Sequence, residues 1–144
     1  DSVEHLNPEY VTHKGDIVIR LTIPYTAVLI TDEMEGFVIP SSFVVVRTDR
    51  SVLIPEYLVW LLNSQKVKKR IYESTVSNML GAVKPRYFAE FELDELHISQ
   101  QLMMADLNRL AQRETQLLAQ LAAEKEKYYD YVLNRVFTDM KRGN

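Results

Sequence analysis

Hydrophobic and polar positions alternate in short runs through the first third of the chain. Runs rich in Val, Ile and Leu occupy residues 17–23, 27–31, 37–39 and 43–48, and Pro40 separates the last two. Short runs of β-branched residues with turn residues between them are typical of strands. The pattern predicts four short strands in a small, mostly antiparallel sheet.

The period changes to that of a helix after this sheet. Pro55 suits the first turn of a helix, where its missing N–H costs nothing, and apolar residues recur at helical spacing over residues 55–63. Ser64 can cap a second helix over residues 65–73. Two short helices are therefore expected to follow the strands.

Residues 99–137 carry the clearest pattern, because they contain no Gly or Pro and consist mostly of good helix formers. At 1.5 Å per residue such a helix would be roughly 58 Å long. The expected fold class is α+β, a small mixed or antiparallel sheet with short helices followed by one long C-terminal coiled-coil helix. The expected domains are residues 1–98, a dimerisation helix over 99–138 and a tail over 139–144.

The long helix carries two apolar stripes. One follows the alternating three- and four-residue steps of a coiled-coil seam and is interrupted at Glu114, and the other lies beside it. A helix of this length cannot bury both stripes against about one hundred residues of its own chain. We therefore expect a helix-to-helix interface in a homodimer. Its expected residues are Met103, Leu107, Leu110, Leu117, Leu118, Leu121, Tyr128 and Val132.

Composition agrees with one ordinary globular domain. The chain has 144 residues, of which 47% are hydrophobic and 26% charged, and it contains no run of eighteen apolar residues that could span a membrane. With no cysteine, the sequence excludes disulfides, thiolate metal sites and a cysteine nucleophile. This suits a reducing cytosol, so a cytoplasmic protein is expected.

Charge is unevenly distributed. The formal net charge is −3, whereas a small nucleic-acid binder is usually positive. Residues 63–87, however, contain six basic side chains and only one acid, Glu73. Because local charge decides whether a phosphate backbone can dock, this segment is either a phosphate-binding surface or an ordinary solvated helix face.

The sequence offers no active site. His5, His13 and His97 are scattered over unrelated segments, and neither a His pair at metal-binding spacing nor a Gly-rich phosphate loop is present. The acids within residues 90–95 lack a positioned partner and fit a solvated strand edge better. We expect His97 to pack between helix and sheet, and we expect no enzyme activity, no metal and no cofactor.

Several short motifs follow one another in a definite order along the chain. They are Lys14-Gly15-Asp16-Ile17-Val18-Ile19, Phe43-Val44-Val45-Val46-Arg47, Ile54-Pro55-Glu56-Tyr57-Leu58 and Leu61-Leu62-Asn63-Ser64, followed by Lys69, Ile71, Gly81, Leu93, Leu96, Ile98 and Gln101. Their order and spacing resemble the target-recognition domain of type I restriction-modification specificity subunits, and the resemblance covers roughly residues 14–135.

The resemblance implies a domain that binds one half of a split DNA sequence. It also implies long helices that pair antiparallel, with methyltransferase subunits, and a restriction subunit as a further partner, bound around them. The chain departs from the family pattern at residues 97–101, which replace a proline-rich start of the helix, and the domain looks short at its N-terminal end. Only one domain-helix unit is present, so two copies related by a two-fold axis would restore the family layout.

The resemblance and the local charge together select candidate DNA contacts. Positions 66, 69 and 70 share one helical face and could follow one phosphate backbone. Arg86 could pair with guanine in the major groove, although an ordinary surface strand over 87–93 would explain its surroundings equally well. The candidates are Lys66, Lys68, Lys69, Arg70, Asn78, Lys84, Arg86, Tyr87, Arg20 and Tyr25.

Two classes of function follow. The favoured one is sequence-specific recognition of double-stranded DNA, serving methylation and restriction chemistry in other subunits. The alternative is a non-DNA interaction module, a small α+β domain on a coiled coil that scaffolds other proteins, or a specificity subunit that has lost its affinity for DNA. The acidic isoelectric point of about 5.6 favours the alternative.

Overall fold

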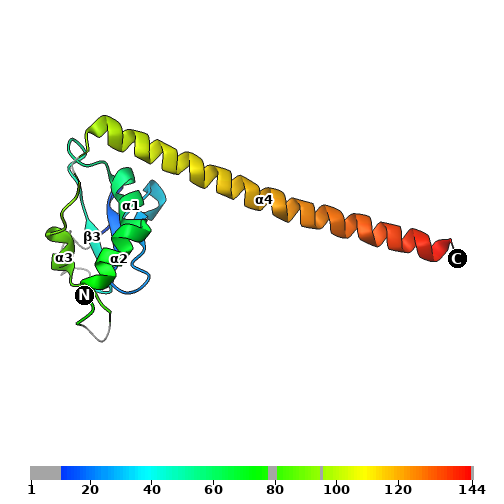
Figure 1. The fold of residues 1–144 in the computed structure, drawn as a ribbon, viewed down its shortest axis with the longest axis horizontal. Helices are drawn as coiled ribbons and strands as arrows, with labels where there is room; N and C mark the ends of the chain where they lie inside the picture. Colours follow the sequence, from blue (N-terminus) through cyan, green and yellow to red (C-terminus); the bar gives the residue numbers. More distant parts are fainter. Residues whose placement is uncertain (1–10, 78–80, 95, 144) are drawn as a thin grey trace. The chain divides into compact units, whose positions relative to one another are not determined.

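The computed structural model describes residues 11–77, 81–94 and 96–143. The chain divides into two compact units, Asp1–Ala105 and Asp106–Asn144. The first unit holds a sheet, three short helices and the first turns of the long helix, and the second unit is the rest of that helix (Figure 1).

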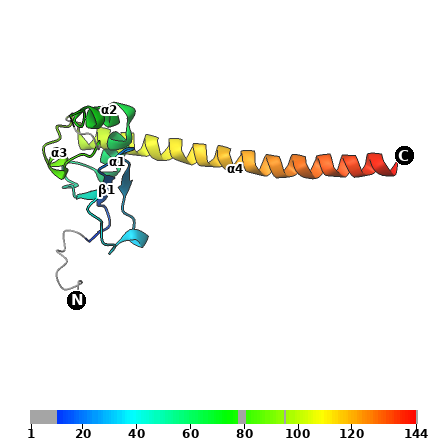
Figure 2. The ribbon, with the colours of Figure 1, turned by 90° about the horizontal axis from the view of Figure 1, so that it is seen from below.

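The sheet has three antiparallel strands in the order β2-β1-β3. Strand β1 (Ile17–Arg20) lies in the centre, with β2 (Ala27–Leu29) and β3 (Phe43–Val46) on its two sides. Ile17 and Ile19 are 0% exposed, because the centre of the sheet is covered by the helices (Figure 2). The acidic loop after β2 contains a short 3-10 helix, η3 (Asp32–Met34).

The predicted fourth strand at residues 37–39 is wrong. Among the described residues, this segment contributes only an isolated bridge between Val38 and Val11. The loop is held instead by Thr12, whose hydroxyl donates to the Met34 carbonyl at 2.7 Å and accepts from the Phe37 N–H at 2.9 Å. The backbone of Phe37 bonds to Thr12 on both sides, its N–H to the hydroxyl and its carbonyl to the N–H, and Pro40 has no N–H with which to extend a ladder.

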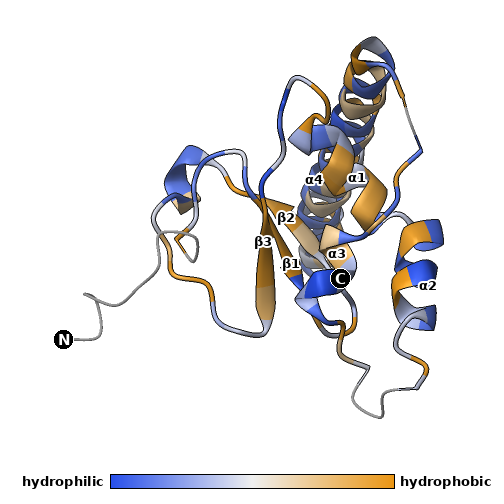
Figure 3. Cartoon of the chain, turned by 90° about the vertical axis from the view of Figure 1, so that its left-hand side faces the viewer, coloured by the Kyte–Doolittle hydropathy of each residue, from blue (hydrophilic) through white to orange (hydrophobic). Residues whose placement is uncertain are grey.

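The two predicted helices are confirmed, and they cover one face of the sheet. Helix α1 (Pro55–Asn63) begins with its proline, and α2 (Gln65–Glu73) begins after Ser64, whose hydroxyl accepts from the Val67 N–H at 3.4 Å. Helix α2 is amphipathic, with Val67 and Ile71 in the core, and Figure 3 shows hydrophobic and hydrophilic positions on different sides of it. Helix α1 is apolar around most of its circumference, and only Glu56 and Asn63 in it are charged or carry an amide. The buried core consists of Ile17, Ile19, Leu21, Tyr25, Ala27, Leu58, Leu62, Val67, Ile71 and Val83.

The alternative of an ordinary surface strand over residues 87–93 does not hold in the structure. A short helix, α3 (Pro85–Ala89), occupies its first part, and the described residues after it have no regular structure. Pro85 presets the first helical turn. The apolar side chains that suggested alternation pack as a cluster instead, since the Tyr87 ring meets Phe88 and Phe91 with centroids 5.4 and 5.6 Å apart.

The long helix is confirmed, but it ends later than predicted. Helix α4 (Ile98–Arg142) has 45 residues and includes positions 139–142 of the predicted tail. Nothing within residues 138–142 breaks a helix, and the first glycine after it, Gly143, is where it stops. His97, expected between helix and sheet, is exposed just before the helix begins.

Candidate nucleic-acid interface

Helix α2 separates its charges from its apolar residues. Val67 and Ile71 are buried in the core, and this fixes the rotation of the helix about its axis. Lys66, Lys69 and Arg70 are therefore exposed together on the opposite side, whereas Lys68 is half-buried. This arrangement can place three cations along one phosphate backbone.

An aromatic cluster joins α2 to α3. The guanidinium carbon of Arg70 lies 4.5 Å from the centroid of the Phe91 ring, which also contacts Tyr87. Burial raises the pKa of the half-buried Tyr87, and the positive charge of Arg70 opposes this effect. Tyr87 is thus part of the support beneath the basic surface, with only part of its ring open to a ligand.

Lys84 and Arg86 are positioned by the segment that precedes α3. The N–H of Val83 donates to the Leu21 carbonyl at 2.8 Å, and the hydroxyl of Tyr25 donates to the Gly81 carbonyl at 2.7 Å. These bonds attach the segment to the core. A shallow groove runs between the end of α2 and α3, and both Lys84 and Arg86 line it.

Two of the candidate cations have acidic neighbours one helical turn away. Lys69 lies 3.9 Å from Glu73, and Arg86 Nε lies 2.8 Å from Glu90. Both pairs are exposed, so water screens them and a phosphate can compete for either cation. Lys66, Lys68, Arg70 and Lys84 form no ion pair with any residue that the structure describes.

Three further candidates lie apart from this surface or outside the description. Arg20 is exposed at the end of β1, where its Nε donates to the Thr22 hydroxyl at 3.0 Å. Tyr25 is only 3% exposed, so the prediction that it contacts DNA is corrected: it is a core residue. Asn78 lies outside the described residues. We name Lys66, Lys68, Lys69, Arg70, Lys84 and Arg86 the basic surface.

The motifs behind the family resemblance have structural roles that the sequence pattern did not reveal. The Asn63 side chain pairs with the backbone of Ala27, accepting from its N–H and donating to its carbonyl, both at 2.9 Å. The amide of Gln101, 3% exposed, accepts from the Ile54 N–H at 2.8 Å and donates to the carbonyls of Val52 and Leu96 at 3.0 Å. These residues hold the fold and are not part of the basic surface.

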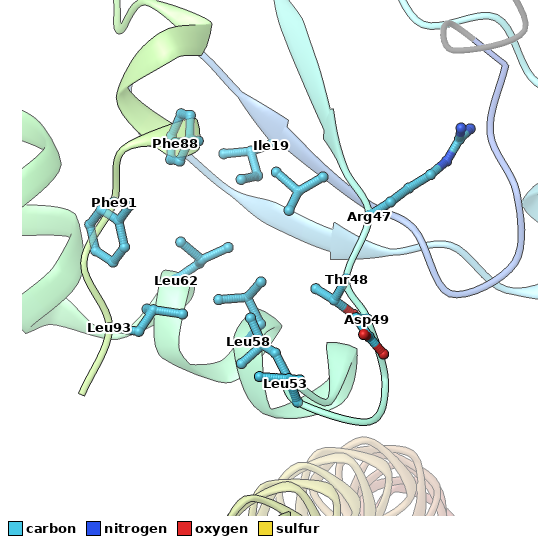
Figure 4. Close-up of a pocket in the computed structure, with 12 residues that line it drawn as sticks. Ile19, Arg47, Thr48, Asp49, Leu53, Leu58, Leu62, Phe88, Phe91 and Leu93 are labelled. Atoms are coloured by element: carbon cyan, nitrogen blue, oxygen red, sulfur yellow. The ribbon is translucent and has the colours of Figure 1, made fainter. Parts of the chain in front are cut away.

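An apolar cavity of about 370 Å³ lies beside the core face of the sheet (Figure 4). Leu53, Leu58 and Leu62 line it from the side of α1, and Phe88, Phe91 and Leu93 from the segment that follows α2. Thr48 lies at its edge, and its buried hydroxyl oxygen has no hydrogen-bond partner in the described structure. Arg47 and Asp49 are the charged residues among its described lining, and the other lining residues apart from Thr48 are apolar.

The described residues contain no group of three or more His, Asp or Glu side chains placed to hold a metal ion. Nor is any helix in the described part of the chain both long and apolar enough to cross a membrane.

Helix α4 exposes its apolar side chains. All but one of the predicted interface positions are exposed in the single chain, and Val132 is half-buried. Leu107 and Leu110 are each 55% exposed, which is far more than a leucine in a packed interior retains. An exposed apolar helix face of this length is typical of a surface that binds another protein.

Comparison with known proteins finds likeness at the level of structure alone. No family model matches the sequence. No curated protein matches it either. A chain from a structural study of the assembly and conformational transition of the type I restriction-modification system matches with a TM-score of 0.66 and 23% identity. The HsdS subunit from Thermoanaerobacter tengcongensis matches with a TM-score of 0.64 and 18% identity.

In both cases the match covers 86% of this chain and 33% of the solved chain, so this chain spans about a third of the length of those proteins. The three-stranded antiparallel sheet, the short helices and the long C-terminal helix are all parts of the matched architecture. Over most of its length, the chain therefore has the fold found in HsdS, the specificity subunit of type I restriction-modification systems.

Proposed function

We propose that this protein is a specificity component of a type I restriction-modification system, and that it recognises one half of a split sequence in double-stranded DNA. The observation that carries the proposal is the basic surface on α2 and α3 within an HsdS-like fold. The protein itself supplies recognition, and the methylation and cleavage chemistry belongs to partner subunits.

The mechanism divides positioning from sequence discrimination. Lys66, Lys69 and Arg70 contact phosphates, because they are exposed on one face of a helix that two buried residues hold in place. Lys84 and Arg86, at the adjoining groove, lie closest to base edges. Arg86 keeps its terminal guanidinium nitrogens available for guanine, because Glu90 accepts from Nε.

The dimer is part of this proposal. Two copies pair their α4 helices antiparallel, as the family resemblance implies, and each copy presents one basic surface to its half-site. Methyltransferase subunits, with a restriction subunit as a further partner, bind the assembled dimer.

Selection of bound duplexes from a random pool, in the presence of candidate methyltransferase subunits, tests the proposal directly. We expect a split, two-part consensus, and an affinity that falls steeply with salt as counterions are released. Replacing Lys66, Lys69 and Arg70 together by Glu should abolish binding. The matched control reverses Arg109, Arg113 and Lys127, three exposed cations of α4, and should leave binding unchanged.

A non-DNA interaction module is the second candidate, and the net charge of −3 favours it. Heparin chromatography separates the two candidates. A dimer that ignores heparin and random duplexes alike contradicts DNA recognition and supports a scaffold, whereas salt-dependent retention that the triple Glu variant loses supports DNA.

A further inference from the structure

The two apolar stripes of α4 are complementary to each other when a second copy runs antiparallel. The two-fold axis then passes between Ala119 and Gln120, and paired residues lie equally far from it in the sequence. This arrangement pairs Leu118 with Leu121 of the partner subunit and Leu117 with Ala122 of the partner subunit. At the centre of the helix, a leucine thus faces either another leucine or an alanine.

The same register continues outward from the axis to Met103 and Val136. Apolar residues meet apolar residues in each of these layers except the one that pairs Glu114 with Lys125 of the partner subunit, and beyond them Gln100 meets Asp139 of the partner subunit. The outer pairs are Tyr128 with Ala111 of the partner subunit, Leu110 with Tyr129 of the partner subunit, Leu107 with Val132 of the partner subunit, and Met103 with Val136 of the partner subunit.

These residues occupy one face of the helix. At about 100° per residue, all of them fall within a band centred on the direction opposite to Ala119 and Gln120. The apparent shift from one stripe to the other near Leu117 and Leu118 is the slow drift expected where apolar spacing is closer to 3.6 than to 3.5 residues per turn. The two stripes are therefore one nearly straight contact line.

The single interruption of the apolar pattern has its complement in this register. Glu114 meets Lys125 of the partner subunit, and Lys125 meets Glu114 of the partner subunit. Both side chains are exposed, and neither forms an ion pair within the described chain, although Asp106 and Glu124 on the same helix do. In a parallel, in-register pair, Glu114 would face Glu114 of the partner subunit, and like charges would repel.

We propose that a second copy of this chain covers the apolar face of α4 in this register, and that the two Glu114–Lys125 pairs select it. A charged pair within an apolar seam specifies register and orientation, because every other alignment buries one charge without its complement. The proposal rests on the dimer of the proposed function and adds the residue-by-residue alignment. DNA plays no part in it.

Cysteine pairing tests the alignment, since the chain has no cysteine of its own. Leu110→Cys alone should form no crosslinked dimer, because the two copies of residue 110 would lie roughly 28 Å apart at 1.5 Å per residue. A mixture of Leu110→Cys with Tyr129→Cys chains should crosslink efficiently with a short thiol reagent. Leu110→Cys mixed with Val136→Cys is the matched control for a slip by one heptad, and it should stay uncrosslinked.

Charge exchange tests the selecting pair. Glu114→Lys alone and Lys125→Glu alone should each weaken dimerisation about tenfold or more in sedimentation equilibrium, since each creates two like-charge contacts per dimer. The double variant should return to within about threefold of the wild type. Arg109→Glu, on the face opposite the contact line, should leave dimerisation unchanged, and circular dichroism confirms that each helix is intact.

The outcomes separate the two proposals. Crosslinking by Leu110→Cys alone, crosslinking in the Val136→Cys mixture, or single charge variants that dimerise like the wild type would overturn the alignment and leave the DNA proposal standing. A chain that is monomeric at high concentration overturns both the alignment and the dimer. A correctly aligned dimer that ignores DNA overturns only the recognition function.

Discussion

The carboxylate of Asp16 is buried beside β1 and binds the side chain of Arg47, which follows β3. Asp16 Oδ1 accepts from Arg47 Nε at 3.0 Å, and Oδ2 accepts from the N–H of His13 at 2.8 Å. The same guanidinium donates to the Val11 carbonyl at 2.9 Å. One ion pair thus joins the turn before β1, the end of β3 and the start of the described chain.

Removing either member of this pair should destabilise the domain. Asp16→Ala should lower the free energy of unfolding by about 2–3 kcal/mol, since the carboxylate is only 5% exposed and its bonds involve charged groups. Arg47→Ala should cost a similar amount, because it leaves a buried charge with a single backbone donor. Urea unfolding of both single variants and of the double variant measures the coupling. If the losses in the two single variants add up to the loss in the double variant, the two side chains contribute to stability independently, and the predicted coupling is wrong.

Gln101 should be the most sensitive position in the first turns of α4. Replacing it by Leu leaves the buried Ile54 N–H and two partly buried carbonyls without their partner, and we expect a loss of about 3 kcal/mol. Gln100→Leu is the matched control. Its side chain is exposed and bonds only to the His97 N–H, so the change should cost less than about 1 kcal/mol. Equal losses of unfolding free energy for Gln101→Leu and Gln100→Leu would contradict the structural role of the Gln101 hydrogen bonds.

Thr48 and Thr12 should respond in opposite directions to the same substitution. The buried hydroxyl of Thr48 has no partner in the described structure, so Thr48→Val should raise the free energy of unfolding by about 1 kcal/mol. Thr12→Val removes a donor and an acceptor that hold the loop after β2, and it should lower stability by about 2 kcal/mol. Thermal unfolding of the two variants gives the comparison, and a destabilised Thr48→Val protein would show that its hydroxyl is satisfied.

Tyr25 should matter for stability and not for DNA. Tyr25→Phe deletes the bond to the Gly81 carbonyl and keeps the buried ring, so a loss of about 1 kcal/mol is expected. Duplex affinity at a temperature where both proteins are folded should stay within about twofold. A tenfold weaker affinity without a change in unfolding would restore Tyr25 as a contact residue.

The order of the motifs predicted the fold because several motif residues make hydrogen bonds on which that fold depends. Asp16, Asn63 and Gln101 each satisfy backbone or side-chain groups far away in the sequence, and such buried polar partnerships tolerate few substitutions. The sequence marked their positions but not their partners, because a partner is defined only after the chain has folded. The candidate DNA residues are different: the structure gathers most of them on one surface, and their contacts to bases stay predictions.

By itself, the amino-acid sequence determined the features that depend on local periodicity. Apolar spacings of three and four residues and the residues at the helix ends predicted the boundaries of α1 and α2 and the serine cap between them. The same spacings predicted that α4 is a long helix with an apolar face. Tertiary structure alone decided the rest. It left residues 37–39 outside the sheet, turned residues 85–89 into a helix, and moved Tyr25 into the core. Bonds between distant segments decided the first and the third, since Thr12 binds the backbone of Phe37 and the Tyr25 hydroxyl binds the Gly81 carbonyl. At residues 85–89 the packing of the Tyr87 ring against Phe88 and Phe91 outweighs the weak alternation of a short apolar run.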